Sequence, residues 1–515
     1  MSGFDVPSPL LPDVIAQHGQ WLGEKAAVVQ GTRQLTWRQF DEASNRVAHG
    51  LAALGLAANA RLALLMSNGI EMVELLFGAG KGVVSAVPIN PSVSDAAVAA
   101  MILDSGAAAV VASGDHCQRI DRLVAAGKLP ATLTRLAVGP AGADWTDWAA
   151  VRDAQPVSRP AIAVRPDAEC NIIYSSGTTG LPKGIVHSQR CRMNWATDLA
   201  ISLRYHSGAR TLCTLGLYSN ISWVAMLATI FAGGTIVVME QSAPASIFEH
   251  IERHRITHSA FVPVQLQRML ECPEASAHDI SSLESIMCCG SPLPTAVKRA
   301  SRDQLHCDLI ELYGLTEGII TVLAPEDFER KLDSVGKPIT GQDIRIIDGD
   351  DREVPWGTEG EIVGFGRLVM DGYHNRPDAT KEATWISPEG TRWLRTGDIG
   401  RLDAEGFLYV VDRKKDMIIS GGQNLYPADI EAVMRDHPAV AEVAVIGVKD
   451  STWGETPVAV VVLQAAAAIA AEQLVEWTNG RVGKQQRIRS VVFRDSLPRN
   501  ANGKILKREL RNECA

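Results

Sequence analysis

The sequence has no excess of basic residues, which bears on the partners it can have. Its 50 Lys and Arg residues are outnumbered by 59 Asp and Glu residues, and the net charge is −9. A polyanionic nucleic acid or an anionic membrane surface attracts positively charged proteins. We therefore expect neither as a partner, and any site for a small anion must supply its own local positive charge.

Paired cysteine motifs are also absent. The nine cysteines form no C-x-x-C pair and show no spacing typical of a metal site, and Cys288 and Cys289 are adjacent, which does not favour a disulfide between them. The N-terminal residues contain neither the basic nor the apolar segment of a secretory leader. We expect reduced, mostly buried thiols and a cytoplasmic location.

The longest stretch without a charged side chain runs from residue 211 to residue 239. It is interrupted by Gly216, by polar residues at 219, 220 and 222, and by the pair Gly233-Gly234. These interruptions favour a core helix followed by a core strand over a transmembrane helix. We expect no membrane span.

The length and the pattern of apolar residues predict more than one domain. With 515 residues, 46% hydrophobic and 21% charged, the chain can form several domains with sizeable cores. Strand-like and helix-like segments alternate up to about residue 400, as in the strand 61–66 and the helix 70–80, and this alternation is typical of parallel sheets flanked by helices. We predict an α/β fold with a large domain over 1–412, which includes a β-rich subdomain over about 333–400, and a small α+β domain over 413–515.

A loop rich in glycine and hydroxyl side chains carries the strongest functional signal. Residues 174–184 read Tyr-Ser-Ser-Gly-Thr-Thr-Gly-Leu-Pro-Lys-Gly and follow an apolar segment that we expect to be a buried strand. Glycines let backbone N–H groups converge on an anion, and the hydroxyl groups and a lysine add donors and charge. The order of residues is not that of the common P-loop. The predicted polyphosphate ligands are Ser175, Ser176, Gly177, Thr178, Thr179, Gly180 and Lys183.

A second group of candidates follows two later strands. Tyr313 offers a flat face for a purine, Thr316 a hydroxyl group and Glu317 a carboxylate suited to Mg²⁺. Gly290 and Ser291 follow an apparent strand at 283–287. We expect these residues, together with Gly314, to bind a nucleotide.

The order and content of these motifs resemble those of the adenylate-forming superfamily, which comprises acyl-CoA synthetases, peptide-synthetase adenylation domains and luciferases. The resemblance spans nearly the whole chain and implies ATP, Mg²⁺ and coenzyme A as ligands. It implies that Asp398 binds the ribose, that Arg413 reaches the nucleotide, and that Lys415 is the hinge of a mobile C-terminal domain. It also places Lys504 at the α-phosphate and the acyl carboxylate, and the pantetheine path beside Ser420, Gly421 and Gly422.

The acyl pocket of this superfamily lies around the stretch that matches residues 216–221. Many relatives have a proline where this chain has Gly216 and a histidine near Ser219. No aspartate occurs between residues 215 and 239, which disfavours an amino-acid substrate. An apolar or aromatic acyl group is predicted instead, with the candidate pocket residues Tyr218, Ser219, Trp223, Ile319 and Ile320.

We therefore predict an AMP-forming acid–CoA ligase of fatty or aromatic acids that acts in fatty-acid metabolism. Three alternatives stay open: an adenylation enzyme that loads a carrier-protein phosphopantetheine, a luciferase-like oxygenase, and a nucleotide-sensing protein without catalytic activity. The last is disfavoured because both Lys183 and Lys504 are present. A homodimer is compatible with the sequence, which does not define the oligomeric state.

Overall fold

The computed structural model describes residues 8–175, 183–240, 242–420, 423–450, 454–465, 467–500 and 503–514. These residues group into two compact units. Unit 1 comprises Met1–Leu332, Pro338–Asp343 and Phe365–Thr384, and unit 2 comprises Asp333–Lys337, Ile344–Gly364 and Trp385–Ala515. The predicted β-rich range 333–400 is thus divided, because residues 365–384 pack in unit 1, and the predicted boundary at residue 412 falls inside unit 2.

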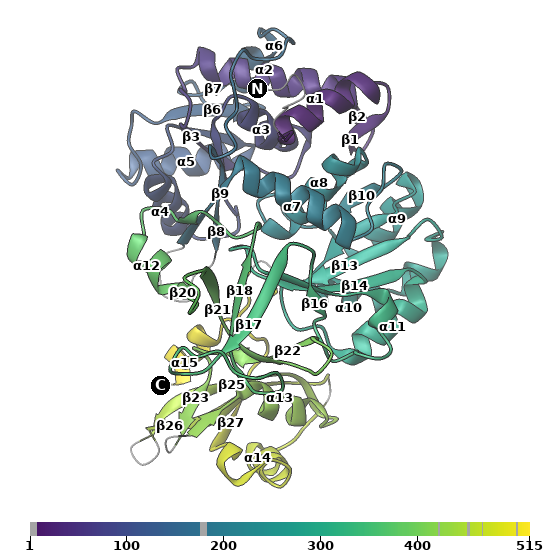
Figure 1. Ribbon diagram of the computed structural model, residues 1–515, viewed down its shortest axis with the longest axis vertical. Coiled ribbons are helices and arrows are strands. Elements are labelled where there is room, and N and C mark those ends of the chain that lie inside the picture. Colours follow the sequence, from purple (N-terminus) through teal and green to yellow (C-terminus); the bar gives the residue numbers. More distant parts are fainter. Residues whose placement is uncertain are drawn as a thin grey trace. The chain divides into compact units, whose positions relative to one another are not determined.

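Unit 1 contains a mixed sheet, sheet A, whose strand order is β16-β15-β14-β13-β12-β10-β11-β1-β2 (Figure 1). Its strands are β1 (Ala26–Gln30), β2 (Arg33–Thr36), β10 (Arg210–Cys213), β11 (Thr235–Val238), β12 (His258–Phe261), β13 (Ser285–Cys289), β14 (Asp308–Gly314), β15 (Ile320–Leu323) and β16 (Lys337–Pro338). From β14 to β1 in this order, each strand is parallel to the next. At the two sides, β2 is antiparallel to β1 and β15 is antiparallel to β14. Helices cover both faces of such a parallel region, so β11 and β12 are buried along their whole length.

A second sheet of unit 1, sheet B, has the order β19-β9-β8-β4-β3-β5-β6-β7. Its strands are β3 (Arg61–Leu65), β4 (Ser85–Pro88), β5 (Ala109–Ser113), β6 (Thr134–Val138), β7 (Thr146–Asp147), β8 (Glu169–Ser175), β9 (Lys183–Ser188) and β19 (Gly372–Tyr373). The β8–β9 pair and the β9–β19 pair are antiparallel, and the remaining neighbours are parallel. The predicted alternation of strands and helices is confirmed, including the helix after β3.

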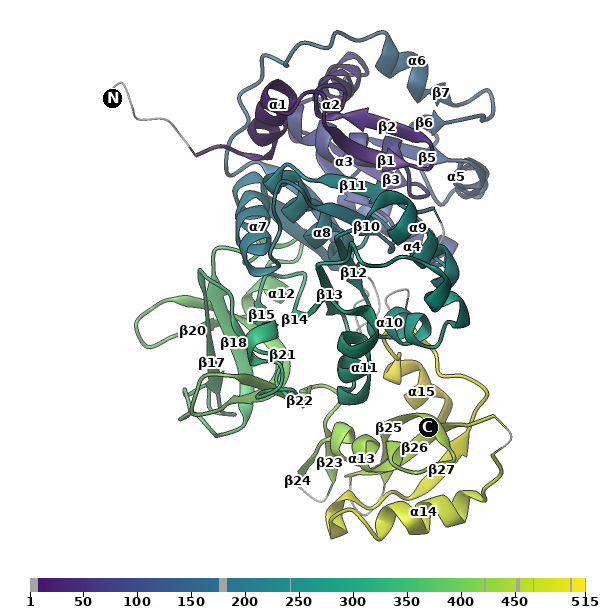
Figure 2. The ribbon, with the colours of Figure 1, turned by 90° about the vertical axis from the view of Figure 1, so that its right-hand side faces the viewer.

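The helices of unit 1 pack against these sheets (Figure 2). They are α1 (Leu11–Trp21), α2 (Trp37–Ala53), α3 (Ile70–Lys81), α4 (Asp95–Ser105), α5 (Asp115–Ala125), α6 (Trp148–Asp153), α7 (Gln189–Ser202), α8 (Asn220–Ala232), α9 (Pro244–His254), α10 (Pro263–Leu270), α11 (Thr295–Leu305) and α12 (Pro377–Glu382). Helix α8 is buried almost all round, which explains its lack of charge, and it is followed by strand β11 as predicted. None of the described helices is long and apolar enough to cross a bilayer.

Unit 2 contains two further sheets. Sheet C has the order β17-β18-β21-β20 with β22 beside β21, and sheet D has the order β24-β23-β26-β25 with β27 beside β26. The strands are β17 (Gln342–Ile347), β18 (Gly360–Gly366), β20 (Thr384–Ile386), β21 (Arg392–Leu402), β22 (Leu408–Arg413), β23 (Ile418–Ser420), β24 (Gln423–Leu425), β25 (Val440–Asp450), β26 (Gly454–Leu463) and β27 (Ser490–Phe493). The helices α13 (Pro427–Arg435), α14 (Ala471–Asn479) and α15 (Lys507–Cys514) complete the C-terminal part.

The fold is therefore the α/β architecture expected, with a large N-terminal part, a β-rich subdomain and a small α+β C-terminal part. All nine cysteines lie within the described residues and are free thiols, six of them buried, at positions 117, 170, 191, 213, 288 and 289. Burial raises the pKa of Cys170, Cys213 and Cys289 to about 12. These thiols fill the core and are held protonated.

Candidate active site

The glycine-rich motif lies in the sequence between β8 and β9, which pair in antiparallel fashion. In the antiparallel register Ser175 pairs with Lys183 and Ile173 with Ile185. Lys183, predicted within the loop, is the first residue of β9. The predicted ligands at 176–180 lie outside the described residues, as does the side chain of Ser175. The structure therefore defines the position of the lysine at the start of β9.

Lys183, Tyr373 and Glu317 form a contiguous chain of contacts. The Lys183 Nζ atom lies over the Tyr373 ring, 4.8 Å from its centroid. The Tyr373 hydroxyl donates a 2.9 Å hydrogen bond to Glu317 Oε1. Burial, and then the Glu317 carboxylate, raise the pKa of Tyr373, so its hydroxyl stays a donor. The predicted phosphate ligand and the predicted metal ligand are thus linked through a tyrosine.

Hydrogen bonds to its backbone fix the turn after β14 that carries Glu317. The Met370 N–H donates to the Glu317 carbonyl at 2.8 Å, and His187 Nε2 bonds the Thr316 carbonyl at 2.8 Å. Gly318 has a φ of +115°, and a Cβ atom there would lie 2.0 Å from the Leu368 carbonyl oxygen. Only glycine fits this close approach of two backbones.

The predicted nucleotide residues Gly290 and Gly314 also occupy positions that need glycine. Gly290, directly after β13, has a φ of +98°, and a Cβ atom there would lie 3.2 Å from the Ile221 side chain. A Cβ atom on Gly314, the last residue of β14, would lie 2.5 Å from the Ile319 carbonyl oxygen. Tyr313 precedes it in β14 and Ser291 follows Gly290, both half-buried.

In unit 2, Asp398 lies opposite Arg413 on neighbouring strands. Asp398 lies within β21 and pairs with Arg413 of β22. Gly397, with a φ of +69°, lies in the irregular step of β21 opposite β18, where Glu361 pairs with Ile399 and Val363 with Arg395. The Arg413 guanidinium donates from Nε to Asp398 Oδ1 at 3.0 Å. The carboxylate is nearly buried, and this ion pair orients it.

The C-terminal lysine lies in the same charged group. Burial, and then the positive charge of Arg413, lower the pKa of Lys504 to about 7, while Asp398 opposes the shift. Lys415 lowers this pKa further and Asp416 raises it. The loop that carries Lys504 is closed by paired hydrogen bonds of 2.9 Å with Asn500. Lys504, Arg413 and Lys415, with Arg511 paired to Asp416, outnumber the carboxylates of Asp398 and Asp416, and an excess of positive charge suits an anion.

The other predicted positions of unit 2 lie nearby in the chain. Lys415 lies in the turn between β22 and β23, and Ser420 is the last residue of β23. Gly421 and Gly422, predicted beside the pantetheine path, lie outside the described residues. Lys414 bonds Glu361 at 2.9 Å, and Arg511 bonds Asp416 at 2.9 Å. Ion pairs thus hold both sides of the predicted hinge.

The predicted acyl-pocket residues differ in what they contact. Tyr218 is half-buried, and its ring covers Gly216, where a Cβ atom would lie 2.0 Å from the ring. This contact gives a physical reason for the glycine. The Ser219 hydroxyl caps α8 by accepting the Ile221 N–H, so it serves the helix. Trp223, Ile319 and Ile320 are buried.

Three contacts were not anticipated from the sequence. Tyr373, which the motifs did not single out, joins Lys183 to Glu317. His187 bonds the Thr316 carbonyl, and Arg192 is a fully buried cation beside Trp223. The sequence did contain a signal for His187. It lies four residues after Lys183, and residues an even number of positions apart on a strand share a face.

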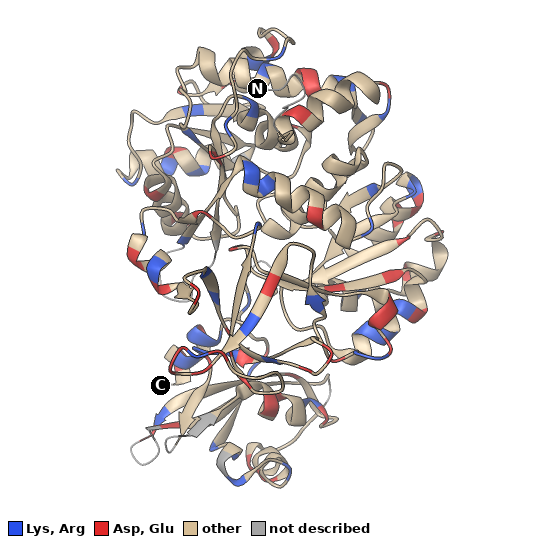
Figure 3. Ribbon diagram, in the orientation of Figure 1, with Lys and Arg blue, Asp and Glu red and all other residues tan. Residues whose placement is uncertain are grey.

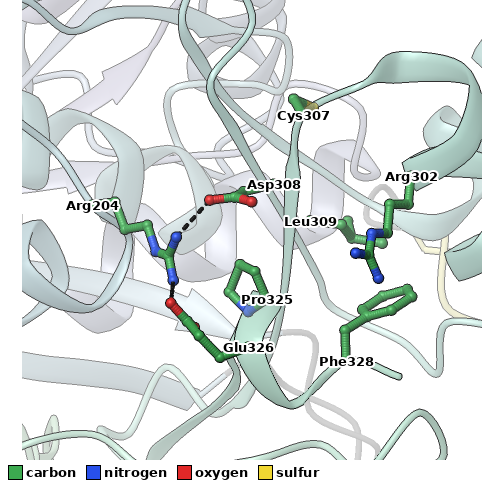
Figure 4. A pocket seen from close by; sticks show the side chains of 8 residues that line it. All are labelled: Arg204, Arg302, Cys307, Asp308, Leu309, Pro325, Glu326 and Phe328. Atoms are coloured by element: carbon green, nitrogen blue, oxygen red, sulfur yellow. Dashed lines mark hydrogen bonds and ion pairs between the residues drawn. The ribbon is translucent and has the colours of Figure 1, made fainter. Parts of the chain in front are cut away.

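A hollow of about 250 Å³ lies at the opposite end of β14 from Tyr313 (Figure 4). It is lined by Arg204, Arg302, Cys307, Asp308, Leu309, Pro325, Glu326 and Phe328. Arg204 is paired with Asp308 at 2.6 Å and also with Glu326. Figure 3 shows basic and acidic residues interspersed over the helices in the same way. The hollow therefore carries little net charge and belongs to a different part of unit 1 from the motifs.

Comparison with known proteins agrees with this geometry. Residues 16–374 match the family of AMP-binding enzymes, and residues 429–504 match the C-terminal domain of AMP-binding enzymes. The chain is 35% identical over 488 residues to the long-chain-fatty-acid–CoA ligase FadD13 of Mycobacterium tuberculosis, with 93% of each chain covered. It is 32% identical over 489 residues to a feruloyl-CoA synthase of an Amycolatopsis species, which covers 94% of this chain and 95% of that protein.

A solved structure of a Mycobacterium tuberculosis fatty acyl CoA synthetase shares the fold. Its TM-score is 0.79 at 32% identity, with 98% of each chain covered. The match includes both the part of the chain that carries Lys183 and Glu317 and the part that carries Lys504. The chain belongs to the AMP-binding, adenylate-forming enzymes and is an AMP-forming acid–CoA ligase.

Proposed function

We propose that this ligase activates a fatty or aromatic acid in two half-reactions. In the first, the acid's carboxylate attacks the α-phosphate of ATP, which gives an acyl-adenylate and pyrophosphate. In the second, the thiol of coenzyme A attacks the adenylate carbonyl and releases AMP. The observation that carries the proposal is the placement of Lys504 beside Asp398 and Arg413 in one charged group.

The first half-reaction brings two anions together, so it needs positive charge. We assign Lys183 and Lys504 to the triphosphate, with Asp398 and Arg413 at the ribose. A cation that meets charge developing in the transition state lowers the barrier by several kcal/mol, on the order of 3–4 for one lost donor. Lys504, with its pKa of about 7, gains its proton fully once an anion binds beside it.

Glu317 fits a magnesium ion that arrives with ATP. One carboxylate oxygen is oriented by the Tyr373 hydroxyl, and the backbone of Glu317 is fixed by Met370. Mg²⁺ prefers oxygen ligands and is usually held by one or two carboxylates together with substrate phosphates. When bound, it would neutralise phosphate charge. The residues of the chain position the carboxylate for that role.

The second half-reaction needs a path for a thiol and removal of Lys504 from the phosphates. We assign Ser420, Gly421 and Gly422 to the pantetheine path, and Lys415 to the hinge about which a C-terminal domain from residue 413 rotates. An acyl-adenylate hydrolyses readily, so the site is expected to exclude water until the thiol arrives.

The acyl class rests on the residues around Gly216 and on the relatives. The stretch from 215 to 239 holds no charged side chain that could pair an α-ammonium group. A fatty acyl group in FadD13 and an aromatic one in the feruloyl-CoA synthase are the substrates in those proteins' names. Tyr218 offers an aromatic surface beside Gly216 that suits either class.

The decisive experiment separates the half-reactions in a Lys504→Ala variant. Adenylation, followed as pyrophosphate release, should fall by at least about a hundredfold, as for a lost transition-state donor. Thioester formation from supplied acyl-AMP and coenzyme A should stay near the wild-type rate. Equal loss of both half-reactions contradicts the assignment.

The same assay distinguishes the acceptor. Wild-type enzyme with ATP and an acid panel is supplied either with coenzyme A or with a phosphopantetheinylated carrier protein. Rapid AMP release with coenzyme A alone supports the proposal. Turnover confined to the carrier protein would instead identify an enzyme that loads carrier proteins.

A further inference from the structure

A buried cluster of polar side chains lies beside the turn that carries Thr316 and Glu317. We call it the Arg192 cluster, and its members are Asn171, His187, Arg192 and Trp223, together with Gln189, which lies three residues before Arg192 on the same helix α7; each is at most 1% exposed. Seven side-chain atoms of the cluster have no hydrogen-bond partner among the described residues. They are Asn171 Nδ2, His187 Nδ1, Gln189 Nε2 and Oε1, Arg192 Nη1 and Nη2, and Trp223 Nε1.

Arg192 is the charged centre of this cluster. Its guanidinium lies 5.1 Å from the Trp195 ring centroid and 4.9 Å from that of Trp223. Its Nε atom donates to Asn171 Oδ1 at 2.7 Å, which leaves both terminal nitrogens free to donate. Burial lowers the pKa of Arg192 to about 10, so the group is still a cation at neutral pH. A buried charge without a counter-ion is costly, and such groups are normally paired.

The free atoms of the cluster are mostly donors. His187 Nε2 must donate to the Thr316 carbonyl, and burial lowers the pKa of His187 well below its usual value, so Nδ1 is an acceptor. With Gln189 Oε1, that makes two free acceptors against five free donors. The cluster is therefore complementary to an oxygen-rich or anionic group.

The position of the cluster connects it to the reaction centre. Lys183, Ile185 and His187 alternate along β9 and share one face, on which Tyr373 also lies opposite Ile185. Glu317 and Thr316 lie over this face, bonded to Tyr373 and His187 respectively. Four residues of a strand span about 13 Å, so the backbone of His187, the member of the cluster on β9, lies about that far from that of Lys183. This distance suits the far end of a medium-length acyl group.

We propose that the Arg192 cluster recognises an oxygen acceptor at the distal end of the acyl substrate, a carboxylate or a ketone, and so selects acids oxidised at both ends. The inference rests on the proposed activation of a carboxylic acid and refines its substrate class. A methyl-terminated chain would leave these buried donors unpaired, which disfavours its binding. Arg192 is then a specificity residue for the distal end of the substrate, remote from the phosphates.

The test compares acids of equal length in the full-length enzyme. Straight-chain and phenyl-substituted acids of increasing length are each supplied as the plain monocarboxylic acid, the terminal dicarboxylic acid and the terminal methyl ketone. At the best length, wild-type kcat/KM for an oxygenated acid should exceed that for the plain acid by about tenfold or more, as for a site built to hydrogen-bond its substrate. Arg192→Met should abolish or invert this ratio, mainly through KM.

Matched variants separate recognition from folding. Arg190→Met removes an exposed positive charge two residues away on α7 and should leave the ratio unchanged. Arg192→Lys should keep part of the preference for the dicarboxylic acid, and Gln189→Leu should reduce it by about threefold, as for one lost hydrogen bond. The Gln189 variant keeps the cation, so it tests the site even if Arg192→Met folds poorly.

The outcomes distinguish the two proposals. Absence of pyrophosphate release with every acid would overturn the proposed substrate class as a whole. Turnover of plain acids with no preference for oxygenated ones, or an unchanged ratio in folded Arg192→Met, would overturn only the recognition by the Arg192 cluster. An Arg192-dependent rise in Tm on titration with sodium chloride, together with an unchanged ratio, would show that a free anion occupies the cluster and would equally overturn it.

Discussion

At the scale of single residues, the charge state of Lys504 predicts how adenylation depends on pH. Its pKa of about 7 lies below the ordinary lysine value because of burial and the neighbouring Arg413. The ammonium is therefore present below about pH 7 in the free enzyme and is lost above it. The kcat/KM for ATP, which reports groups of the free enzyme, should fall as the pH rises through about 7. Measuring pyrophosphate release from about pH 6 to pH 9 checks this decrease in kcat/KM.

The Lys504→Arg variant is the control for that pH profile. A guanidinium stays charged throughout this pH range. Whatever its residual rate, the variant should therefore show no decrease in kcat/KM near pH 7. A decrease in kcat/KM with the same midpoint in both proteins would assign the titration to another group, such as the nucleotide itself.

Tyr373 predicts a separate effect on the use of magnesium ATP. Tyr373→Phe removes the 2.9 Å hydrogen bond to Glu317 Oε1 and keeps the ring beneath Lys183. A lost hydrogen bond to a charged group costs about 1.5 kcal/mol, so kcat/KM should fall by about tenfold. The Mg²⁺ concentration for half-maximal rate should rise in steady-state assays.

The matched control is Tyr409→Phe, which removes a hydroxyl that bonds Asp403 at 3.3 Å in unit 2. It should leave the dependence on Mg²⁺ unchanged. An equal shift in both variants, or none in Tyr373→Phe, would remove Glu317 from the proposed metal role.

At the scale of elements, the turn between β14 and β15 depends on Gly318. Gly318→Ala would place a methyl group 2.0 Å from the Leu368 carbonyl oxygen, at a φ of +115°. Both backbones must then separate, which costs above about 3 kcal/mol. Gly357→Ala is the comparison, since Gly357 has a φ of +94° but no atom within 4 Å of the added Cβ. That change carries only the conformational cost of about 1–2 kcal/mol.

Thermal unfolding should rank the two variants. Gly318→Ala should lower Tm by at least about 5 °C, since each kcal/mol corresponds to about 2 °C in a large domain. Gly357→Ala should lower it by less, about 2–4 °C. Equal values of Tm for the two variants would contradict the close backbone approach at Gly318.

The elements that could be predicted from the sequence are those with local causes. The strand β3, the helix α3 after it and the pair α8–β11 follow from apolar periodicity and glycine positions. Gly-Asp is a local turn signal, yet at Asp398 the neighbouring strand β22 pairs with the segment and holds it in a strand. Pairing with another strand determines the backbone conformation at that position, and a local sequence pattern holds no information about such pairing.

The residues of the candidate site divide in the same way, into those that local motifs identify and those that long-range packing brings to the site. Lys183, Glu317 and Lys504 were identified from motif order, whereas Tyr373 and Arg192 were not. Tyr373 is brought to Lys183 by the pairing of β19 with β9, which are far apart in the sequence. Arg192 would ordinarily be read as an exposed helix residue, and only the packing of α7 against Trp223 of α8 buries it.

At the scale of the whole molecule, each compact unit carries one of the two lysines assigned to ATP. Lys183 belongs to unit 1 with Glu317 and Tyr373, and Lys504 belongs to unit 2 with Asp398 and Arg413. Within the described chain the groups near Lys504 are cationic in excess, with Arg413 and Lys415 beside it. A ligase that uses one site for two reactions gains from this division, because the lysine needed for adenylation must leave before the thiol attacks.

The proposed hinge at Lys415 makes that requirement testable. Lys415→Pro fixes φ near −65° and removes the backbone N–H, so rotation at this residue should be blocked. Lys504 interacts electrostatically with Arg413, Lys415 and Asp416, in and beside the turn between β22 and β23, so adenylation should continue within about threefold of wild type. Formation of acyl-CoA from supplied acyl-AMP should fall by at least about a hundredfold, since the rearrangement would limit the rate. Rapid-quench measurement of both half-reactions decides the point: wild-type thioester formation in this variant would place the hinge elsewhere, and parallel loss of both would indicate a local folding defect.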